Sequence, residues 1–152
     1  MKRRKSGLLI KLVAIILVVS LCTPTGALAA VPETAAPRAS EYIVLYNAYI
    51  YPAGNGELQI WFEITGTNYW TDIGAMTVFL YESTDNENFT WLRSFLYEDN
   101  DAMMAHDEIA HASHVDYTGI PGRYYKACVY FRAGTADDYD IRYLWTPVVL
   151  CN

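Results

Sequence analysis

The chain has few basic residues and few cysteines, and it has no long apolar run. Each of these absences excludes a class of protein. It has neither a Gly-x-Ser-x-Gly nucleophile elbow nor a His-Glu-x-x-His zinc motif. The apolar run between Lys11 and Thr23 has 11 residues, whereas a membrane-spanning helix needs roughly 20. These absences indicate a protein that is not an enzyme of either motif class and has no stable membrane span.

The first 29 residues have the order of a secretory signal peptide. A basic start, Lys2 to Lys5, precedes the apolar run Leu12–Cys22, a break at Thr23-Pro24-Thr25-Gly26 and the small residues of Ala27-Leu28-Ala29. A signal peptidase reads small residues at the first and third positions before its cleavage site. We therefore predict a signal peptide over residues 1–29, cleaved after Ala29, and a secreted product. A retained membrane anchor is the alternative, and the short run disfavours it.

Cleavage would make the protein strongly acidic. Of the 11 lysines and arginines, five lie before residue 30, while all 17 aspartates and glutamates lie after it. The mature chain then carries six positive and 17 negative charges, a net charge of −11. A field of this sign repels nucleic acid backbones and anionic lipid surfaces, so neither is an expected partner.

The mature chain has room for one domain. Residues 30–40 (AVPETAAPRAS) are small, contain proline and show no periodicity, so they predict a flexible linker before a single domain over 41–152. Cys128 and Cys151 remain after cleavage. A hairpin that turns near Ala136 would place residue 128 opposite about residue 143, too far from Cys151 for a disulfide. A bridge would need the C-terminus to fold back.

Alternating apolar residues and many aromatic rings predict strands. Tyrosine, tryptophan, valine, isoleucine and threonine favour strands, and turn residues interrupt the runs about every 10 residues. The expected strands are 42–51, 58–64, 76–80, 89–97, 123–132 and 139–149, with a weaker pattern over 101–115 that combines a helical turn at Met103 and a strand from Ile109. This pattern predicts an all-β, antiparallel sandwich of about seven strands. An open barrel is the alternative.

Four of the expected strands have a face assigned to the core. The alternation places Val44 inward in the first strand and Met76 inward in the third. The remaining inward positions are Tyr42, Tyr46, Ala48 and Ile50; Leu58, Ile60, Phe62 and Ile64; Val78 and Leu80; and Tyr125, Ala127, Val129 and Phe131.

The stretch Pro121-Gly122-Arg123-Tyr124-Tyr125-Lys126-Ala127-Cys128-Val129 resembles the start of the sixth strand of fibronectin type III domains. The resemblance implies a fibronectin type III or immunoglobulin-like sandwich. It also implies that Tyr125 is a tyrosine corner, whose ring packs inward and whose hydroxyl bonds to backbone a few residues upstream. Gly119 replaces the leucine usual in that family two positions before the proline. The role implied for Tyr125 is structural.

The mature chain also resembles a family of small secreted proteins of Gram-positive gut bacteria that is classed only as a domain of unknown function. The resemblance lies in Tyr49-Ile50-Tyr51-Pro52-Ala53-Gly54-Asn55-Gly56, Tyr81-Glu82-Ser83-Thr84-Asp85 and Gly122-Arg123-Tyr124-Tyr125-Lys126-Ala127. That family implies no activity and no catalytic residue.

Two kinds of metal site are conceivable from the sequence. Asp99 and Asp101, and Asp138 and Asp140, lie in acidic turns that offer the oxygen ligands of calcium, although neither turn has the ligand spacing of an EF-hand. The histidines at 106, 111 and 114 lie among carboxylates and would suit zinc. Solvated acidic turns and a polar edge strand explain the same residues, so no cofactor is expected, with calcium as the candidate ion.

Surplus aromatic residues are the strongest sign of a binding surface. Tyr49, Tyr51, Trp61 and Tyr130 fall on strand faces opposite the core, and Tyr69-Trp70 falls in an expected loop. We take Trp61, Tyr69, Trp70 and Tyr130 as the candidate ligand-binding residues, because exposed rings that gather in a patch mark binding surfaces for sugars or proteins. Packing under loops would be the structural alternative.

The sequence thus favours a secreted, non-catalytic binding or adhesion module for a glycan or a surface protein. A secreted effector or toxin-like factor is a second hypothesis, and a small metal-dependent hydrolase that uses residues 106–116 is a third. The sequence leaves the ligand and the oligomeric state open.

Overall fold

The computed structural model of this protein describes residues 40–152, and these residues form an antiparallel, all-β structure. The predicted signal peptide and most of the predicted linker lie outside the described residues. Strands and 3-10 turns follow in the order β1 (Ile43–Gly54), β2 (Glu57–Trp70), β3 (Asp72–Ser83), β4 (Thr90–Leu96), η1 (Tyr97–Asp99), η2 (Asp101–Met103), β5 (Met104–Ala105), β6 (Glu108–Thr118), β7 (Tyr124–Gly134), β8 (Tyr139–Trp145) and β9 (Val149–Leu150).

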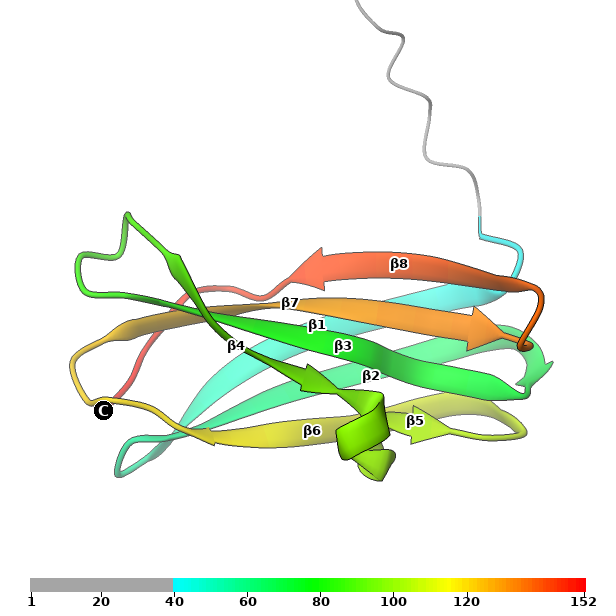
Figure 1. Ribbon diagram of the computed structural model, residues 1–152, viewed down its shortest axis with the longest axis horizontal. Coiled ribbons are helices and arrows are strands. Elements are labelled where there is room, and N and C mark those ends of the chain that lie inside the picture. Colours follow the sequence, from blue (N-terminus) through cyan, green and yellow to red (C-terminus); the bar gives the residue numbers. More distant parts are fainter. Residues whose placement is uncertain (1–39) are drawn as a thin grey trace, which may run out of the picture. The chain divides into compact units, whose positions relative to one another are not determined.

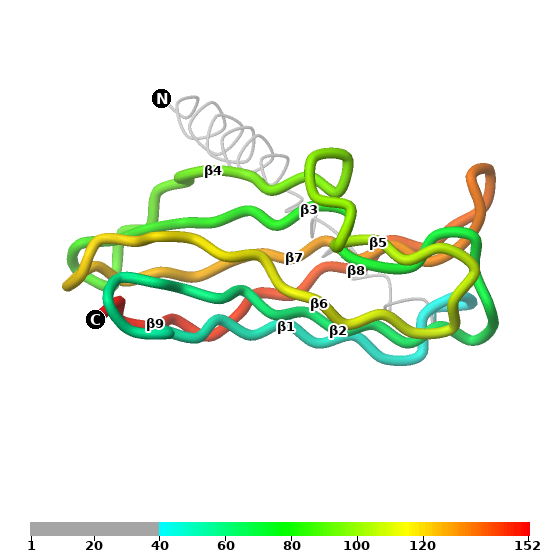
Figure 2. Tube along the Cα trace, turned by 90° about the horizontal axis from the view of Figure 1, so that it is seen from below, coloured from blue at the N-terminus to red at the C-terminus, as the bar shows by residue number. Residues whose placement is uncertain are grey.

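The strands of this region form two sheets that face each other (Figures 1 and 2). One sheet has the order β1-β2-β6, and the other has the order β4-β3-β7-β8, with β5 on β3 and β9 on β7. In Figure 2, β3 and β4 run along one side of the domain and β1 and β2 along the other. The predicted sandwich is confirmed. Nine strands replace the expected seven or so, because β5 and β9 are two-residue additions to β3 and β7.

The core lies between the sheets and uses one face of each strand. Alternate residues of β2 and β7 are almost completely buried, as their alternation predicts. Burying one such side chain stabilises the fold by about 1.5–3 kcal/mol. The inward residues of these two strands include Leu58, Ile60, Phe62, Ile64, Tyr125, Ala127, Val129, Phe131 and Ala133.

Two β-bulges overturn the inward positions predicted for Val44 and Met76. Ile43 pairs with Gly66 and Leu45 pairs with Thr65, so Val44 is an extra residue, and 67% of it is exposed. A second register shift falls between residues 75 and 77, so Ala75 takes the core position and Met76 is only half-buried. An extra residue in one strand reverses the alternation behind it, and composition alone does not reveal it.

The two cysteines among residues 40–152 are unbridged and buried. Cys128 pairs with Trp145 and points to the outer side of its sheet, whereas Cys151 belongs to the core. Burial raises the pKa of both thiols, which keeps them protonated and unreactive at neutral pH. The last predicted strand ends early, at Trp145, and resumes as β9 after Pro147, which has no backbone N–H to donate.

Tyr125 forms the predicted tyrosine corner. Its ring is fully buried, and its hydroxyl oxygen accepts a hydrogen bond of 2.9 Å from the backbone N–H of Ile120. The ring also explains the glycine at 119, because a Cβ there would lie 3.1 Å from both the Tyr125 ring and Leu58. The corner therefore ties the β6–β7 connection to the core.

We expect Tyr125→Phe to destabilise the domain by about 1–2 kcal/mol, because the Ile120 N–H loses its partner. Urea unfolding followed by circular dichroism measures the change. Tyr124→Phe is the matched control, since no hydrogen bond of the Tyr124 hydroxyl occurs within residues 40–152. Equal stability of the two variants would contradict the role of the corner.

Asp85 organises the loop between β3 and β4. Its carboxylate accepts hydrogen bonds from the Asn88 side chain, from the backbone N–H groups of Glu87 and Asn88, and from the Ser83 hydroxyl. These bonds, with the Asn88 amide the strongest, hold the pKa of Asp85 well below its usual range. A carboxylate whose pKa is lowered by folding stabilises the folded state only while it is ionised.

The destabilisation caused by Asp85→Ala should therefore depend on pH. We expect the variant to melt below the parent protein at every pH above about 5, where Asp85 is ionised in both folded and unfolded chains. The gap should shrink as the pH falls below about 4, because the unfolded parent chain then binds a proton at Asp85 that the folded chain, with its lowered pKa, does not bind. Thermal melts from pH 2 to pH 7 measure it, and a gap that stays constant across this range would refute the assignment.

Candidate ligand-binding face

The outer side of the β1-β2-β6 sheet carries a row of rings. Strand register places Tyr49 beside Trp61 and Trp61 beside His114, while Tyr51, Gln59 and Asp116 form the next row. All of these residues alternate with core residues, so they point away from the core. We call this surface the Trp61 face and define it by Tyr49, Tyr51, Gln59, Trp61, Glu63, His114 and Asp116.

Neighbouring side chains orient Trp61. Its indole ring stacks on His114, with centroids 4.4 Å apart and planes at 22°. Its indole N–H donates to the side-chain oxygen of Gln59 at 3.3 Å, and the Gln59 amide donates in turn to Asp116 at 3.1 Å. Contacts from both β2 and β6 therefore hold the ring, although 38% of Trp61 remains exposed.

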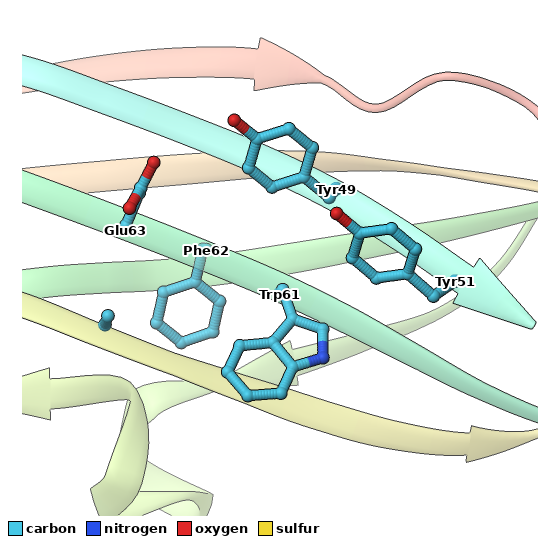
Figure 3. Close-up of a pocket in the computed structure, with 6 residues that line it drawn as sticks. Tyr49, Tyr51, Trp61, Phe62 and Glu63 are labelled. Carbon is cyan, nitrogen blue, oxygen red and sulfur yellow. The ribbon is translucent and has the colours of Figure 1, made fainter. Parts of the chain in front are cut away.

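Two tyrosines continue the aromatic surface on β1. Tyr49 and Tyr51 stack with centroids 6.1 Å apart, and they are 39% and 50% exposed. Beside them lies a hollow of about 230 Å³. Figure 3 shows both tyrosines beside Trp61 and Glu63. The hollow is lined by Tyr49, Tyr51, Trp61, Phe62, Glu63 and Ala112.

The polar groups of this face are acidic or neutral. The Asn47 amide donates to the Glu63 carboxylate at 2.7 Å, which fixes that carboxylate at the rim of the hollow. Asp116 lies 3.6 Å from the His114 imidazole. None of the strands β1, β2 and β6 contains a lysine or an arginine. The surface therefore combines exposed rings with hydrogen-bond acceptors and has no strong cation.

The structure does not bring the four predicted ligand-binding residues together. Tyr69 and Trp70 belong to the end of β2, so the loop expected there is wrong. Trp70 packs on Tyr42 at 4.7 Å and donates its indole N–H to the Tyr42 carbonyl oxygen at 3.2 Å. Tyr69 is 66% exposed. Trp70 therefore holds the residue before β1 in place. Tyr69 does not line the hollow.

Tyr130 points outward on β7, in the other sheet. It stacks with Tyr143 at 5.5 Å and meets the edge of Phe79 at 5.5 Å. Of the four predicted residues, only Trp61 thus lines the hollow. The sequence did not reveal that His114 supports Trp61 or that Asp116 holds Gln59, because both contacts depend on the register of β6 against β2.

The acidic residues predicted for calcium lie in two separate regions, and Asp140 belongs to strand β8. Asp99 ends η1 and Asp101 begins η2. Asp140 accepts hydrogen bonds from the Ser40 hydroxyl and the Glu41 N–H, and the Ser40 bond lowers the pKa of Asp140. The Tyr42 hydroxyl donates to Asp138, which raises the pKa of Tyr42 to about 12.

These bonds anchor the end of the predicted linker, at Ser40, to the turn between β7 and β8. Two of the four carboxylates that were predicted as calcium ligands, Asp138 and Asp140, thus hold the start of the domain in place. The expectation of no cofactor, with calcium as the candidate ion, stays a prediction.

The three histidines point to different neighbours. His106 contacts Asp72 and the Thr71 carbonyl oxygen, each at 3.0 Å, and His111 contacts the Ala102 carbonyl oxygen at 2.8 Å. His114 stacks on Trp61. Across residues 40–152, no three His, Cys, Asp or Glu side chains gather in a group suited to a metal ion.

The same residues contain no helix that is long and apolar enough to cross a membrane. Comparisons of the chain with protein families, with curated proteins and with solved structures give no match. The geometry of the Trp61 face is therefore the basis on which a function can be proposed.

We expect calcium, zinc and chelator to leave the melting temperature of the domain unchanged, because the carboxylates and imidazoles of the described region are dispersed. A metal that binds only the folded state at 100 times its dissociation constant adds about 2.7 kcal/mol. Thermal melts with each metal and with chelator would show a shift of that size. A rise with calcium would instead identify one of the acidic turns as a site.

Proposed function

We propose that this protein is a secreted, non-catalytic extracellular binding module that holds a glycan on its Trp61 face. The proposal rests on one observation: three exposed rings from adjacent strands lie beside a hollow whose rim carries fixed polar groups. Secretion is supported by the signal-peptide pattern of residues 1–29.

The chemistry of this face suits a sugar. An aromatic ring has a negative face, which attracts the weakly positive C–H groups on the apolar side of a pyranose. The side chains of Gln59, Glu63 and Asp116 supply acceptors and donors for the hydroxyl groups around its edge. A concave surface of rings with a few placed polar groups is the usual composition of a small-molecule site.

Charge narrows the class of glycan. The face presents carboxylates, and its three strands have no lysine or arginine. The mature chain is also strongly acidic overall. Glycans rich in carboxylate or sulfate would meet repulsion of the same sign, so neutral glycans are the proposed ligands.

The spacing of the carboxylates supports binding without catalysis. Glu63 lies opposite Ala112 in β6, four residues along that strand from Asp116. At about 3.3 Å per residue that offset amounts to about 13 Å, whereas glycosidases hold their two carboxyl groups about 5–9.5 Å apart. The backbone positions of this pair are therefore further apart than the carboxyl groups of a glycosidase pair, which favours binding over the usual two-carboxylate hydrolysis.

We further propose that the sandwich is of the fibronectin type III or immunoglobulin-like kind. The tyrosine corner at the start of β7 supports this assignment, because such a tyrosine marks the corresponding strand in these folds. Domains of that architecture host many functions, so the fold adds little to the glycan proposal itself.

We expect Trp61→Ala to weaken glycan binding at least tenfold while the fold remains intact, because a buried contact with an aromatic anchor is commonly worth about 2 kcal/mol. The measurement is tryptophan fluorescence and calorimetric titration with soluble neutral oligosaccharides and with purified neutral cell-wall polysaccharide. Circular dichroism verifies folding of the variant.

Tyr69→Ala is the matched control, because Tyr69 is more exposed than Trp61 but lies away from the hollow. It should bind as the parent does. If the parent protein bound none of these glycans, or if both variants lost binding equally, the Trp61 face would not be a glycan site.

A further inference from the structure

The β4-β3-β7-β8 sheet also has an aromatic outer side, which we call the Trp145 face. Register aligns its rings in rows across the strands, with Tyr81 beside Trp91 and Tyr130 beside Tyr143. Nothing among residues 40–152 forms a third layer over this sheet. The face consists of Phe79, Tyr81, Trp91, Leu96, Tyr130, Tyr139, Ile141, Tyr143 and Trp145.

The rings of this face form a connected layer. Tyr81 and Trp145 have centroids 5.1 Å apart, and Tyr130 and Tyr143 stack at 5.5 Å. Lys126 lies within the layer, with its ammonium 4.2 Å from the Phe89 ring centre and 4.9 Å from that of Trp145. Cation–π contacts replace part of the hydration of the ammonium group. A partner can therefore bury part of this lysine at a reduced desolvation cost.

The face is large enough for a protein partner. Trp91 and Tyr143 are each 59% exposed, and Tyr139 and Trp145 are each 44% exposed. At roughly 200 Å² per aromatic side chain these four rings alone present about 400 Å². With Leu96, Ile141 and the half-buried rings the face reaches on the order of 700 Å², close to the roughly 800 Å² that each partner contributes to a standard interface.

The charge of the face selects the partner. Its charged residues are Lys126, Arg132 and one carboxylate, Asp72, which lies at the end of β3 and pairs with Arg132 at 3.3 Å. The rest of the chain is strongly acidic, so two copies repel each other over most of their surface. Two such copies meet the least electrostatic repulsion when they approach through a face that has almost no free negative charge.

We propose that a second copy of this chain covers the Trp145 face, in a symmetric dimer whose two β4-β3-β7-β8 sheets pack against each other. Such a twofold interface is self-complementary, because each copy contributes the same patch. Pairing with the Trp61 face of another copy would be a heterologous contact, which extends into a ring or a filament instead of closing as a dimer.

The arrangement has a consequence that rests on the proposed function. In this dimer the two Trp61 faces lie on opposite outer sides, so the assembly would present two glycan sites. Two sites on one particle raise the apparent affinity for a multivalent surface without any new contact. The dimer itself does not depend on the glycan, and its test is separate.

The test is the mass of the protein in solution by light scattering and sedimentation, at about 1 to 100 µM. The sample is the chain from Ala30, which retains every described residue. We expect the mass of two chains for the parent. Tyr143→Glu puts a carboxylate in the middle of the interface and should raise the dissociation constant by about 30-fold or more.

Tyr69→Glu adds the same charge away from the face and should leave the dimer intact. Leu96→Glu tests the face from another strand, and circular dichroism reports folding of each variant. A parent protein that is monomeric at 100 µM would overturn the proposal, and so would equal loss of the dimer in Tyr69→Glu. If the monomer instead bound neutral phospholipid vesicles through this face, the second copy would be the wrong occupant.

Discussion

Two packed sheets can cover only one side of each sheet, the side turned to the other sheet. The rest of the structure depends on this constraint. The core side is filled by aliphatic residues with a few rings, such as Phe62, Tyr125 and Phe131. Strands alternate their side chains strictly, so most rings of this tyrosine-rich and tryptophan-rich chain have to point outward. The exposed rings are therefore a consequence of the architecture, and the functional question is how they are arranged.

The two outer sides differ in how their rings are supported. On the Trp61 face, hydrogen bonds between Gln59, Trp61 and Asp116 hold the ring among polar groups. On the Trp145 face, rings contact other rings and Lys126, with few polar atoms between them. The first arrangement suits a ligand that needs both ring stacking and hydrogen bonds, and the second suits an apolar partner. This contrast explains why we assign a glycan to one side and a protein surface to the other.

The strands and most of the core could be predicted from the sequence, whereas the sites could not. Alternation in Leu58–Ile64 and Tyr125–Phe131 located the core correctly, because a period of two is a local property. It failed at Val44 and Met76, where a bulge adds a residue that only the partner strand reveals. The stack of Trp61 on His114 joins residues 53 positions apart, so it depends on register between distant strands. Alternation in β8 predicts that Trp145 points outward. It does not predict which residues of β3 and β7 lie beside Trp145.

The tyrosine corner links these observations to function. Tyr125 holds the β6–β7 connection, and the same two strands carry His114 of the Trp61 face and Tyr130 of the Trp145 face. A shift of either strand by one residue would exchange its inward and outward side chains. It would remove His114 from Trp61 and turn Tyr130 into the core. The buried ring of Tyr125 and its bond to Ile120 therefore contribute to both outer surfaces, although they lie on neither.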